Sequence, residues 1–312
     1  MANLAYLQLT RECNQDCLFC SNPKSGQATT LEECLSQARL FQAQGYDGVI
    51  LTGGEPTLVE WLPQLMQALG ALGLAFRLIT NGQRCADRAF LEGLKAAGLG
   101  HLHVSLYSAR PEVQGRLTGN PDSLAAVDAC LGNCADLHLH ADVNITIQAW
   151  NQDHLDEVAA FVVQRHPAVR HVVFNFLDPS GPKAAARPDC LPTLPDTELS
   201  LHRALTLLAS RGLSFRVERV PLCYLGEFAY ASTETRKIVK GEERSIAFLD
   251  QKGLVRQRNF FHGKAQACEV CTLSPICAGL FELDKAYSSR WLYPMFLPLE
   301  PIVRAIRDGE RS

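Results

Sequence analysis

The sequence predicts an α/β fold: a partial (β/α)6 TIM-like barrel followed by a small C-terminal extension. Three observations support this prediction. Strand-like segments of period two alternate with helix-like segments through the first 180 residues. The alternation occurs six times, which favours a parallel sheet with right-handed crossovers but is too short for a closed eight-stranded barrel. A stretch with five prolines, residues 179–195, then interrupts the pattern.

Each predicted strand is a short apolar run, and many of these runs end in glycine or polar residues. Such endings are expected where the loops at the C-terminal edge of a sheet build a site. The strands are expected at residues 4–10, 48–54, 75–82, 101–108, 140–148 and 171–179. The helices are expected at about residues 30–44, 60–72, 87–97, 122–134 and 152–165. The first helix begins with a sequence that resembles a capping box, Thr29–Glu33, and Gly45 is suited to its C-terminal end.

The chain after the proline-rich stretch is expected to form a second, smaller unit. A helix, a strand and a β-hairpin are expected there, at residues 196–211, 213–220 and 245–261. The hairpin turn is expected at the sequence QKG, residues 251–253. We therefore divide the chain into a core barrel, residues 1–190, and an extension, residues 191–312.

The composition is that of a folded protein without a strongly charged partner. Apolar residues make up 47% of the 312 residues and charged residues 20%, so a sizeable core can be buried. The formal net charge of −3 gives no electrostatic reason to expect a nucleic-acid partner. No apolar run approaches the roughly 20 residues of a membrane span. No signal peptide is visible either, so a cytoplasmic location without membrane contact is expected.

Twelve cysteines in a reducing compartment are expected to serve metals or catalysis rather than disulfides. Three of them, Cys13, Cys17 and Cys20, lie within eight residues directly after the first predicted strand. Three thiolates on one loop can hold three irons of a [4Fe–4S] cube and leave the fourth iron open to another ligand. A structural zinc site prefers four ligands in paired knuckles, and the next thiol along the chain is as distant as Cys34.

Two motifs together indicate a resemblance to a known family. The segment CNQDCLFC, residues 13–20, has the spacing CxxxCxxC with an aromatic residue, Phe19, before its last cysteine. The segment GGEP, residues 53–56, follows at the end of the second predicted strand. In this order and at this separation, the motifs resemble those of the radical S-adenosylmethionine (radical SAM) enzymes over residues 1 to about 185.

The resemblance implies two cofactors and a reaction. In this family the amino and carboxylate groups of SAM bind the open iron of the [4Fe–4S] cluster. One electron then cleaves SAM to methionine and a 5′-deoxyadenosyl radical, which abstracts a substrate hydrogen. A reductant such as flavodoxin or ferredoxin would supply the electron. The protein itself places the reactants and excludes water.

The resemblance also implies a SAM-binding set at the ends of the strands. The glycine pair of GGEP lets the backbone approach the methionyl group closely, because neither residue has a side chain. The residues implied are Phe19, Gly53, Gly54, Glu55, Pro56, Ser105, Asn144 and Leu177. Asn81 is common in the family at its position, but an Asn-Gly turn explains it equally well.

The sequence does not assign a catalytic acid or base. The segment SLYS, residues 105–108, stands where many relatives have Ser-Leu-Asp, which leaves the roles of Tyr107 and Ser108 open. The possible acid or base residues are Tyr107, Asp178, Tyr224 and His262.

A second group of cysteines lies near the end of the chain. Cys268, Cys271 and Cys277 form CxxCxxxxxC, which resembles the auxiliary-cluster segment of the SPASM and Twitch radical SAM enzymes. A full SPASM domain adds a further cysteine where this chain has Phe281, so we expect one auxiliary [4Fe–4S] cluster rather than two. Cys223 is the expected fourth ligand. A four-thiolate zinc site is the alternative.

Three functions follow from these expectations. The first is a radical SAM oxidoreductase that modifies a peptide of the RiPP type, because many SPASM and Twitch relatives do so. The second is a small-molecule or cofactor-biosynthetic radical SAM enzyme, because the chain starts directly at the barrel without a peptide-recognition domain. The third, a non-catalytic iron–sulfur electron carrier or zinc protein, leaves GGEP unexplained.

The histidines of HLH (101–103) and HLHAD (138–142) alternate along predicted strands in a way that resembles a metal site. They fall at strand starts, which is the opposite end of the barrel from its chemistry. A structural role is therefore favoured for them.

Overall fold

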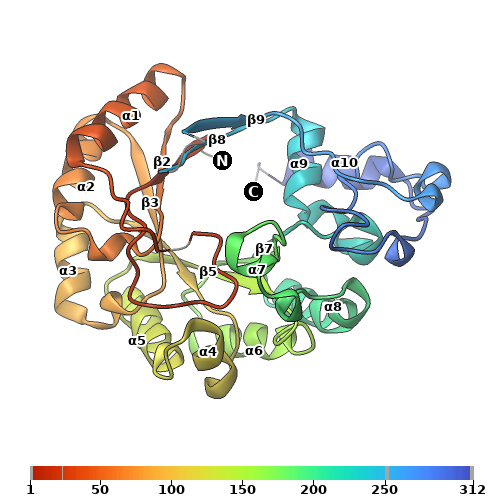
Figure 1. Cartoon of the computed structure of the whole chain (residues 1–312), viewed down its shortest axis with the longest axis horizontal. Helices are drawn as coiled ribbons and strands as arrows, with labels where there is room; N and C mark the ends of the chain where they lie inside the picture. Colours follow the sequence, from red (N-terminus) through yellow and green to blue (C-terminus); the bar gives the residue numbers. More distant parts are fainter. Residues whose placement is uncertain (1–2, 23, 250–252, 310–312) are drawn as a thin grey trace.

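The computed structural model describes residues 3–22, 24–249 and 253–309. Its strands are β1 (Leu4–Gln8), β2 (Gly48–Thr52), β3 (Ala75–Thr80), β4 (His101–Ser105), β5 (His140–Ile147), β6 (His171–Phe176), β7 (Ser214–Glu218), β8 (Arg244–Ala247) and β9 (Leu254–Gln257). Six helices follow the strands of the sheet on its outer side (Figure 1): α1 (Leu31–Ala43), α2 (Leu62–Ala71), α3 (Arg88–Ala96), α5 (Ser123–Asp136), α6 (Leu155–Arg165) and α8 (Leu194–Ser210). The other α-helices of the described residues are α4 (Pro111–Thr118), α7 (Pro182–Ala185), α9 (Thr233–Lys240) and α10 (Leu299–Asp308).

The strands form one curved sheet in the order β7-β6-β5-β4-β3-β2-β1-β8-β9, and β7 and β9 are its edges. Every neighbouring pair is parallel except β8 and β9. Because the edges do not pair with each other, the barrel is open, and the predicted fold class is confirmed. The helices α1, α2, α3, α5, α6 and α8 lie along the outside of the curved sheet (Figure 1).

The main hydrophobic core lies between the sheet and this outer layer of helices. Leu51, Leu78, Leu102, Val143 and Phe174 are fully buried and belong to one continuous apolar cluster. Their strand neighbours point to the opposite face, because successive side chains of a strand alternate. That inner face carries polar residues at the C-terminal ends of the strands, so the fold supplies a polar interior at the edge where a site is expected.

The sequence predicted the boundaries of the first helix well. Thr30 accepts a hydrogen bond from the Glu33 backbone N–H, and the Glu33 carboxylate accepts one from the Thr30 N–H, which confirms the capping box. Gly45 follows the end of α1 with a φ of +82°, a conformation that favours glycine. By contrast, α4 was not predicted, because it fills only eight residues of a loop between Pro111 and Gly119.

Strands from after residue 190 join both sides of the six-stranded unit. β7 pairs parallel with β6, and β8 pairs parallel with β1. The predicted hairpin is confirmed by the antiparallel pairing of β8 and β9, although residues 251 and 252 of its turn lie outside the described residues. The sheet therefore continues beyond the six predicted core strands, and the division at residues 190 and 191 stays a proposal. No helix in the described ranges is long and apolar enough to cross a membrane.

Candidate functional site

The cysteine loop between β1 and α1 packs against the glycine pair that follows β2. The Gly54 N–H donates to the Thr10 carbonyl at 2.6 Å, and the Glu55 N–H donates to the Glu12 carbonyl at 2.8 Å. A Cβ atom on Gly54 would lie 2.1 Å from the Glu12 carbonyl oxygen, and one on Gly53 would lie 2.4 Å from that of Thr10. The glycines are therefore needed for the backbone contact that positions the loop directly before Cys13, in addition to any approach to a ligand.

The carboxylate of Glu55 is buried and fully engaged in hydrogen bonds. Its Oε1 accepts from the Thr57 N–H, the Thr57 hydroxyl and the Thr80 hydroxyl at 2.7–3.1 Å. Its Oε2 accepts from the Asn81 N–H at 2.7 Å. Burial raises the pKa of this carboxyl group, while the four hydrogen bonds oppose that rise. The side chain thus ties the end of β2 to the end of β3.

Asn81 connects this corner to the cysteine loop. Its Nδ2 donates to the Asn14 Oδ1 at 2.7 Å and lies 3.8 Å from the Cys13 Sγ. A turn-forming role alone does not explain these contacts, because the side chain reaches across to the loop that carries the thiols.

The three loop cysteines open onto a cavity of about 300 Å³ at the C-terminal ends of the strands. Of the SAM-binding residues expected from sequence, the cavity is lined by Phe19, Gly53, Gly54, Glu55, Ser105 and Leu177. Pro56 instead begins a buried 3₁₀ turn behind the glycine pair. Asn144 lies beside Ser105 in register, and its Oδ1 accepts a hydrogen bond from Asn175, which does line the cavity.

Burial dominates the electrostatics of the loop thiols. It raises the pKa of Cys17 to about 12 and raises the pKa values of Cys13 and Cys20 as well. Lys183 opposes the rise at Cys17, and its Nζ lies 2.6 Å from Asp16 Oδ1 and 3.1 Å from the Cys17 carbonyl oxygen. Without a metal these thiols are protonated at neutral pH, so deprotonation would accompany metal binding.

Tyr107 is a half-buried wall residue of the same cavity. Its ring packs edge-on against Phe19 with 4.9 Å between the ring centroids. Burial raises the pKa of its hydroxyl well above the usual value, so the phenol is neutral. The loop that carries Tyr107 is fixed by Gln114, whose side-chain oxygen accepts from the N–H groups of Tyr107 and Ser108.

A chain of buried side chains continues from Gln114 to the cysteine loop. The Gln114 Nε2 donates to the Ser123 hydroxyl at 3.0 Å, and the Gln15 Nε2 donates to the same hydroxyl at 3.1 Å. Gln15 lies between Cys13 and Cys17, so this relay fixes the distance between the thiols and the end of β4.

Arg219 is a wall residue that the sequence analysis missed. It directly follows β7 and lines the cavity together with Asp178. Its backbone has a φ of +61°, a conformation that is strained for a non-glycine residue, and its N–H donates to the buried carboxylate of Glu234. Within the described part of the chain, the guanidinium forms no ion pair and contacts the Phe281 ring at 5.8 Å. Assigning the seventh strand to the same sheet would have placed this residue at the site edge.

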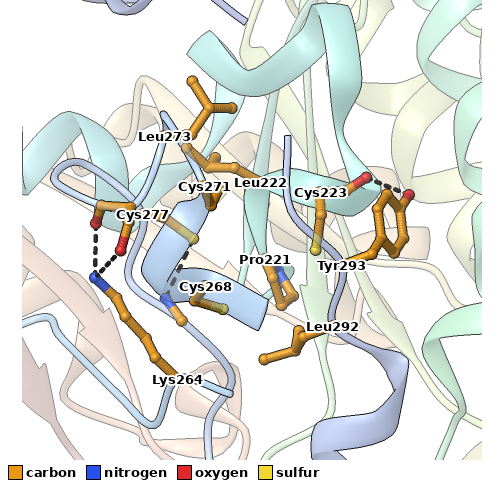
Figure 2. A pocket seen from close by; sticks show the side chains of 12 residues that line it. Pro221, Leu222, Cys223, Lys264, Cys268, Cys271, Leu273, Cys277, Leu292 and Tyr293 are labelled. Carbon is orange, nitrogen blue, oxygen red and sulfur yellow. Dashed lines mark hydrogen bonds between the residues drawn. The ribbon is translucent and has the colours of Figure 1, made fainter. Parts of the chain in front are cut away.

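The second set of cysteines also lines a single cavity. Cys223, Cys268, Cys271 and Cys277 surround it (Figure 2). Its other lining residues include the apolar Pro221, Leu222, Leu273 and Leu292 and the polar Lys264 and Tyr293. Cys223 belongs to the 3₁₀ turn Leu222–Tyr224, and Cys268 belongs to the 3₁₀ turn Gln266–Val270.

Backbone N–H groups point at two of these sulfur atoms. The Met295 N–H donates to the Cys271 Sγ at 3.3 Å, and the Gly279 N–H donates to the Cys277 Sγ at 3.4 Å. Burial raises the pKa of Cys223 to about 12 and also raises that of Cys277.

The spacing of the thiols bears on the choice between zinc and a cluster. Across the described residues, no three cysteines place their Sγ atoms within 4.8 Å of one another. A tetrahedral zinc with bonds of about 2.3 Å holds its sulfur ligands about 3.8 Å apart. A [4Fe–4S] cube takes one thiolate at each iron and holds its sulfur ligands farther apart than a single zinc ion does.

The remaining residues considered from sequence have structural partners. The Tyr224 hydroxyl donates to the Trp291 carbonyl at 2.7 Å, and His262 packs edge-on against Phe281. The cysteines outside the two sites are all buried: Cys34, Cys85, Cys130, Cys134 and Cys190.

Comparison with known proteins places this geometry in a family context. The family model described as the radical SAM superfamily matches residues 7–162, which is half of the chain. The chain is 32% identical over 165 residues to GTP 3′,8-cyclase of Aquifex aeolicus, covering 50% of this chain and 51% of the relative. It is 32% identical over 168 residues to PqqA peptide cyclase of Rhizobium meliloti, and the match covers 53% of this chain and 44% of the relative. The chain thus spans about half the length of the curated relatives it matches.

A solved structure extends the similarity to nearly the whole chain. Native anSMEcpe with bound AdoMet and Cp18Cys peptide superimposes with a TM-score of 0.64 at 13% identity. The match covers 99% of this chain and 97% of that one. At this identity the similarity shows a shared fold, which here includes the C-terminal extension.

Proposed function

Because the chain belongs to the radical SAM superfamily, and therefore to enzymes that use a [4Fe–4S] cluster and SAM, we propose that it modifies a peptide substrate with the help of a second, auxiliary cluster. When bound, the first cluster and SAM supply the electron and the 5′-deoxyadenosyl radical that abstracts a substrate hydrogen.

In this proposal Cys13, Cys17 and Cys20 hold the first cluster. The Gly53–Gly54 backbone contact and the Asn81 amide keep the cysteine loop in place. Ser105, at the end of β4, and Leu177, just after β6, would contact SAM across the cavity from the glycine pair. Phe19 and Tyr107 would pack together and keep water from that part of the cavity.

The auxiliary site would bind one [4Fe–4S] cluster through Cys223, Cys268, Cys271 and Cys277. Four thiols line one cavity, and no three cysteines of the described residues have their Sγ atoms within 4.8 Å of one another; both observations support this assignment. Four thiolates would leave no open iron, which suits electron transfer rather than direct substrate binding. The site would thus accept the electron that remains on the substrate after hydrogen abstraction.

The observation that carries the peptide assignment is the group of four cysteines around one cavity beside the core barrel. The fold also superimposes over nearly its full length on anSMEcpe, whose structure holds a Cp18Cys peptide. The similarity to PqqA peptide cyclase points the same way. The SAM cavity is also bordered by Asp178 and Arg219, which offer opposite charges to the polar groups of a peptide.

A nucleotide substrate is the second candidate. Two relatives support it: GTP 3′,8-cyclase of Aquifex aeolicus and the probable GTP 3′,8-cyclase of Thermococcus kodakarensis, the latter 37% identical over 127 residues. Arg219 could then meet a phosphate instead of a carboxylate.

One experiment separates the two substrates. The reconstituted protein is incubated anaerobically with SAM, dithionite and either GTP or the short peptides encoded next to its gene. We expect a peptide product that has lost two hydrogen atoms by mass spectrometry, with GTP unchanged. Conversion of GTP, with every peptide unchanged, would contradict the proposal. Flavodoxin or ferredoxin should replace dithionite as the reductant.

A further inference from the structure

Two histidines and one aspartate meet at the end of the barrel that faces away from the cysteine loop. His101 and His103 are the first and third residues of β4, and Asp142 is the third residue of β5. His103 and Asp142 are register partners on these adjacent strands. Since alternate residues share a face, the three side chains lie on the same face of the sheet as Ser105, but at its N-terminal edge.

The three side chains already have the spacing of metal ligands. His101 Nε2 lies 2.7 Å from Asp142 Oδ2, and His103 Nδ1 lies 3.3 Å from the same oxygen. One ligand atom from each residue falls within 4.8 Å of the other two. A tetrahedral zinc with bonds of about 2.0–2.2 Å places its nitrogen and oxygen ligands about 3.4 Å apart. Only small side-chain movements separate the observed arrangement from a coordination site.

The hydrogen bonds among these three residues leave one buried ring nitrogen without a partner. His103 is 9% exposed, and its buried Nε2 has no hydrogen-bond partner in the structure. Its ring stacks on that of His101, with 4.9 Å between the centroids, so the two imidazoles are held side by side. Asp142 is also buried, and a buried carboxylate between two imidazoles is a donor set suited to Zn²⁺.

We propose that His101, His103 and Asp142 bind one Zn²⁺ ion at the N-terminal end of the barrel, with the fourth position open to water. The ion would tie β4 to β5 at the edge opposite the radical chemistry. This site is independent of the two cysteine sites, because it shares no residue with either of them.

The surrounding charges set the strength of this site. Arg77 and Arg216 lie near enough to act on the histidines of this edge, and both oppose a cation. Two more histidines lie at this edge. His171 on β6 is the register partner of Asp142, and the ring centroid of His140 is 5.9 Å from that of His101. We therefore expect weaker binding than at a four-thiolate zinc site, and release of the ion by a strong chelator.

The test compares zinc uptake by four full-length proteins whose iron–sulfur clusters have been reconstituted: the natural chain, His101→Ala, Asp142→Asn and His166→Ala. The last is a matched control, since His166 also pairs with an aspartate, Asp128 at 2.9 Å, but lies outside the group. We expect the natural chain and His166→Ala to take up one zinc per chain more than the other two variants. Far-ultraviolet circular dichroism verifies folding, and Asp142→Asn nearly preserves the side-chain volume.

Cobalt identifies the ligands. Co²⁺ added to the natural chain should give visible d–d bands without the near-ultraviolet sulfur-to-cobalt charge-transfer band, and His101→Ala should abolish those bands. Equal zinc uptake by all four proteins, or a cobalt spectrum dominated by thiolate charge transfer, would overturn the proposal. Neither result depends on SAM cleavage, so the test is separate from that of the proposed function.

Discussion

Replacing Gly54 with alanine should disable the first cysteine site while leaving most of the fold intact. The new Cβ would lie 2.1 Å from the Glu12 carbonyl oxygen and 2.9 Å from the Arg11 carbonyl carbon, whereas ordinary contacts begin at 3.4 Å. The two backbones must therefore separate by about 1 Å, which also strains the two hydrogen bonds between them. We expect a loss of stability of about 2–4 kcal/mol. Since Cys13 directly follows Glu12, a shift of about 1 Å should slow SAM cleavage about 100-fold.

The assay measures 5′-deoxyadenosine formed per reconstituted cluster, together with the thermal midpoint. The control is Gly93→Ala in α3, where a Cβ meets no atom within 4 Å and helix propensity should raise stability by about 1 kcal/mol. If Gly54→Ala binds iron normally and cleaves SAM at the rate of the natural chain, the close backbone contact is not what positions the loop, and our explanation of the glycine pair fails.

Three further predictions concern single side chains. Glu55→Ala should lower the stability of the fold by about 3–5 kcal/mol, because it leaves four buried donors without their acceptor. Glu55→Gln should lower it less, and equal thermal midpoints for the two variants would contradict this. In protein lacking the first three cysteines, Cys223→Ala should lower the iron content or change the EPR spectrum, and an unchanged spectrum would remove Cys223 from the auxiliary site. Burial and Glu218 raise the pKa of Glu234 from 4.5 to about 7, so the folded state holds this proton more tightly, and up to about 3 kcal/mol of stability is lost as pH rises from about 4.5 to 7. Thermal midpoints between pH 5 and pH 8 should fall for the natural chain and stay flatter for Glu234→Gln.

The sequence allowed the fold class and the edge that carries the site to be predicted, because both follow from local patterns. Alternating strands and helices imply a parallel sheet, and the C-terminal ends of parallel strands meet at one edge. The cysteine loop, Gly53 and Ser105 come together for that reason. The seventh and eighth strands were assigned to a separate unit, because a proline-rich break precedes them and their pairing with β6 and β1 is a long-range contact.

Side-chain partners were harder to predict than positions. Glu55 was assigned to ligand contact from its motif, yet its carboxylate holds Thr57, Thr80 and Asn81, which only the arrangement of β2 beside β3 reveals. The pairing of His103 with Asp142 depends on the register between β4 and β5, and short-range patterns do not set that register.

The central claim is that Cys13, Cys17 and Cys20 support reductive cleavage of SAM. The most direct test is the amount of 5′-deoxyadenosine formed by anaerobically reconstituted protein with SAM and dithionite, compared with the variant in which these three cysteines are alanine. We predict product from the natural chain and none from the variant, which should keep the iron of its auxiliary site. Product from the variant, or none from a natural chain with its full iron content, would contradict the claim.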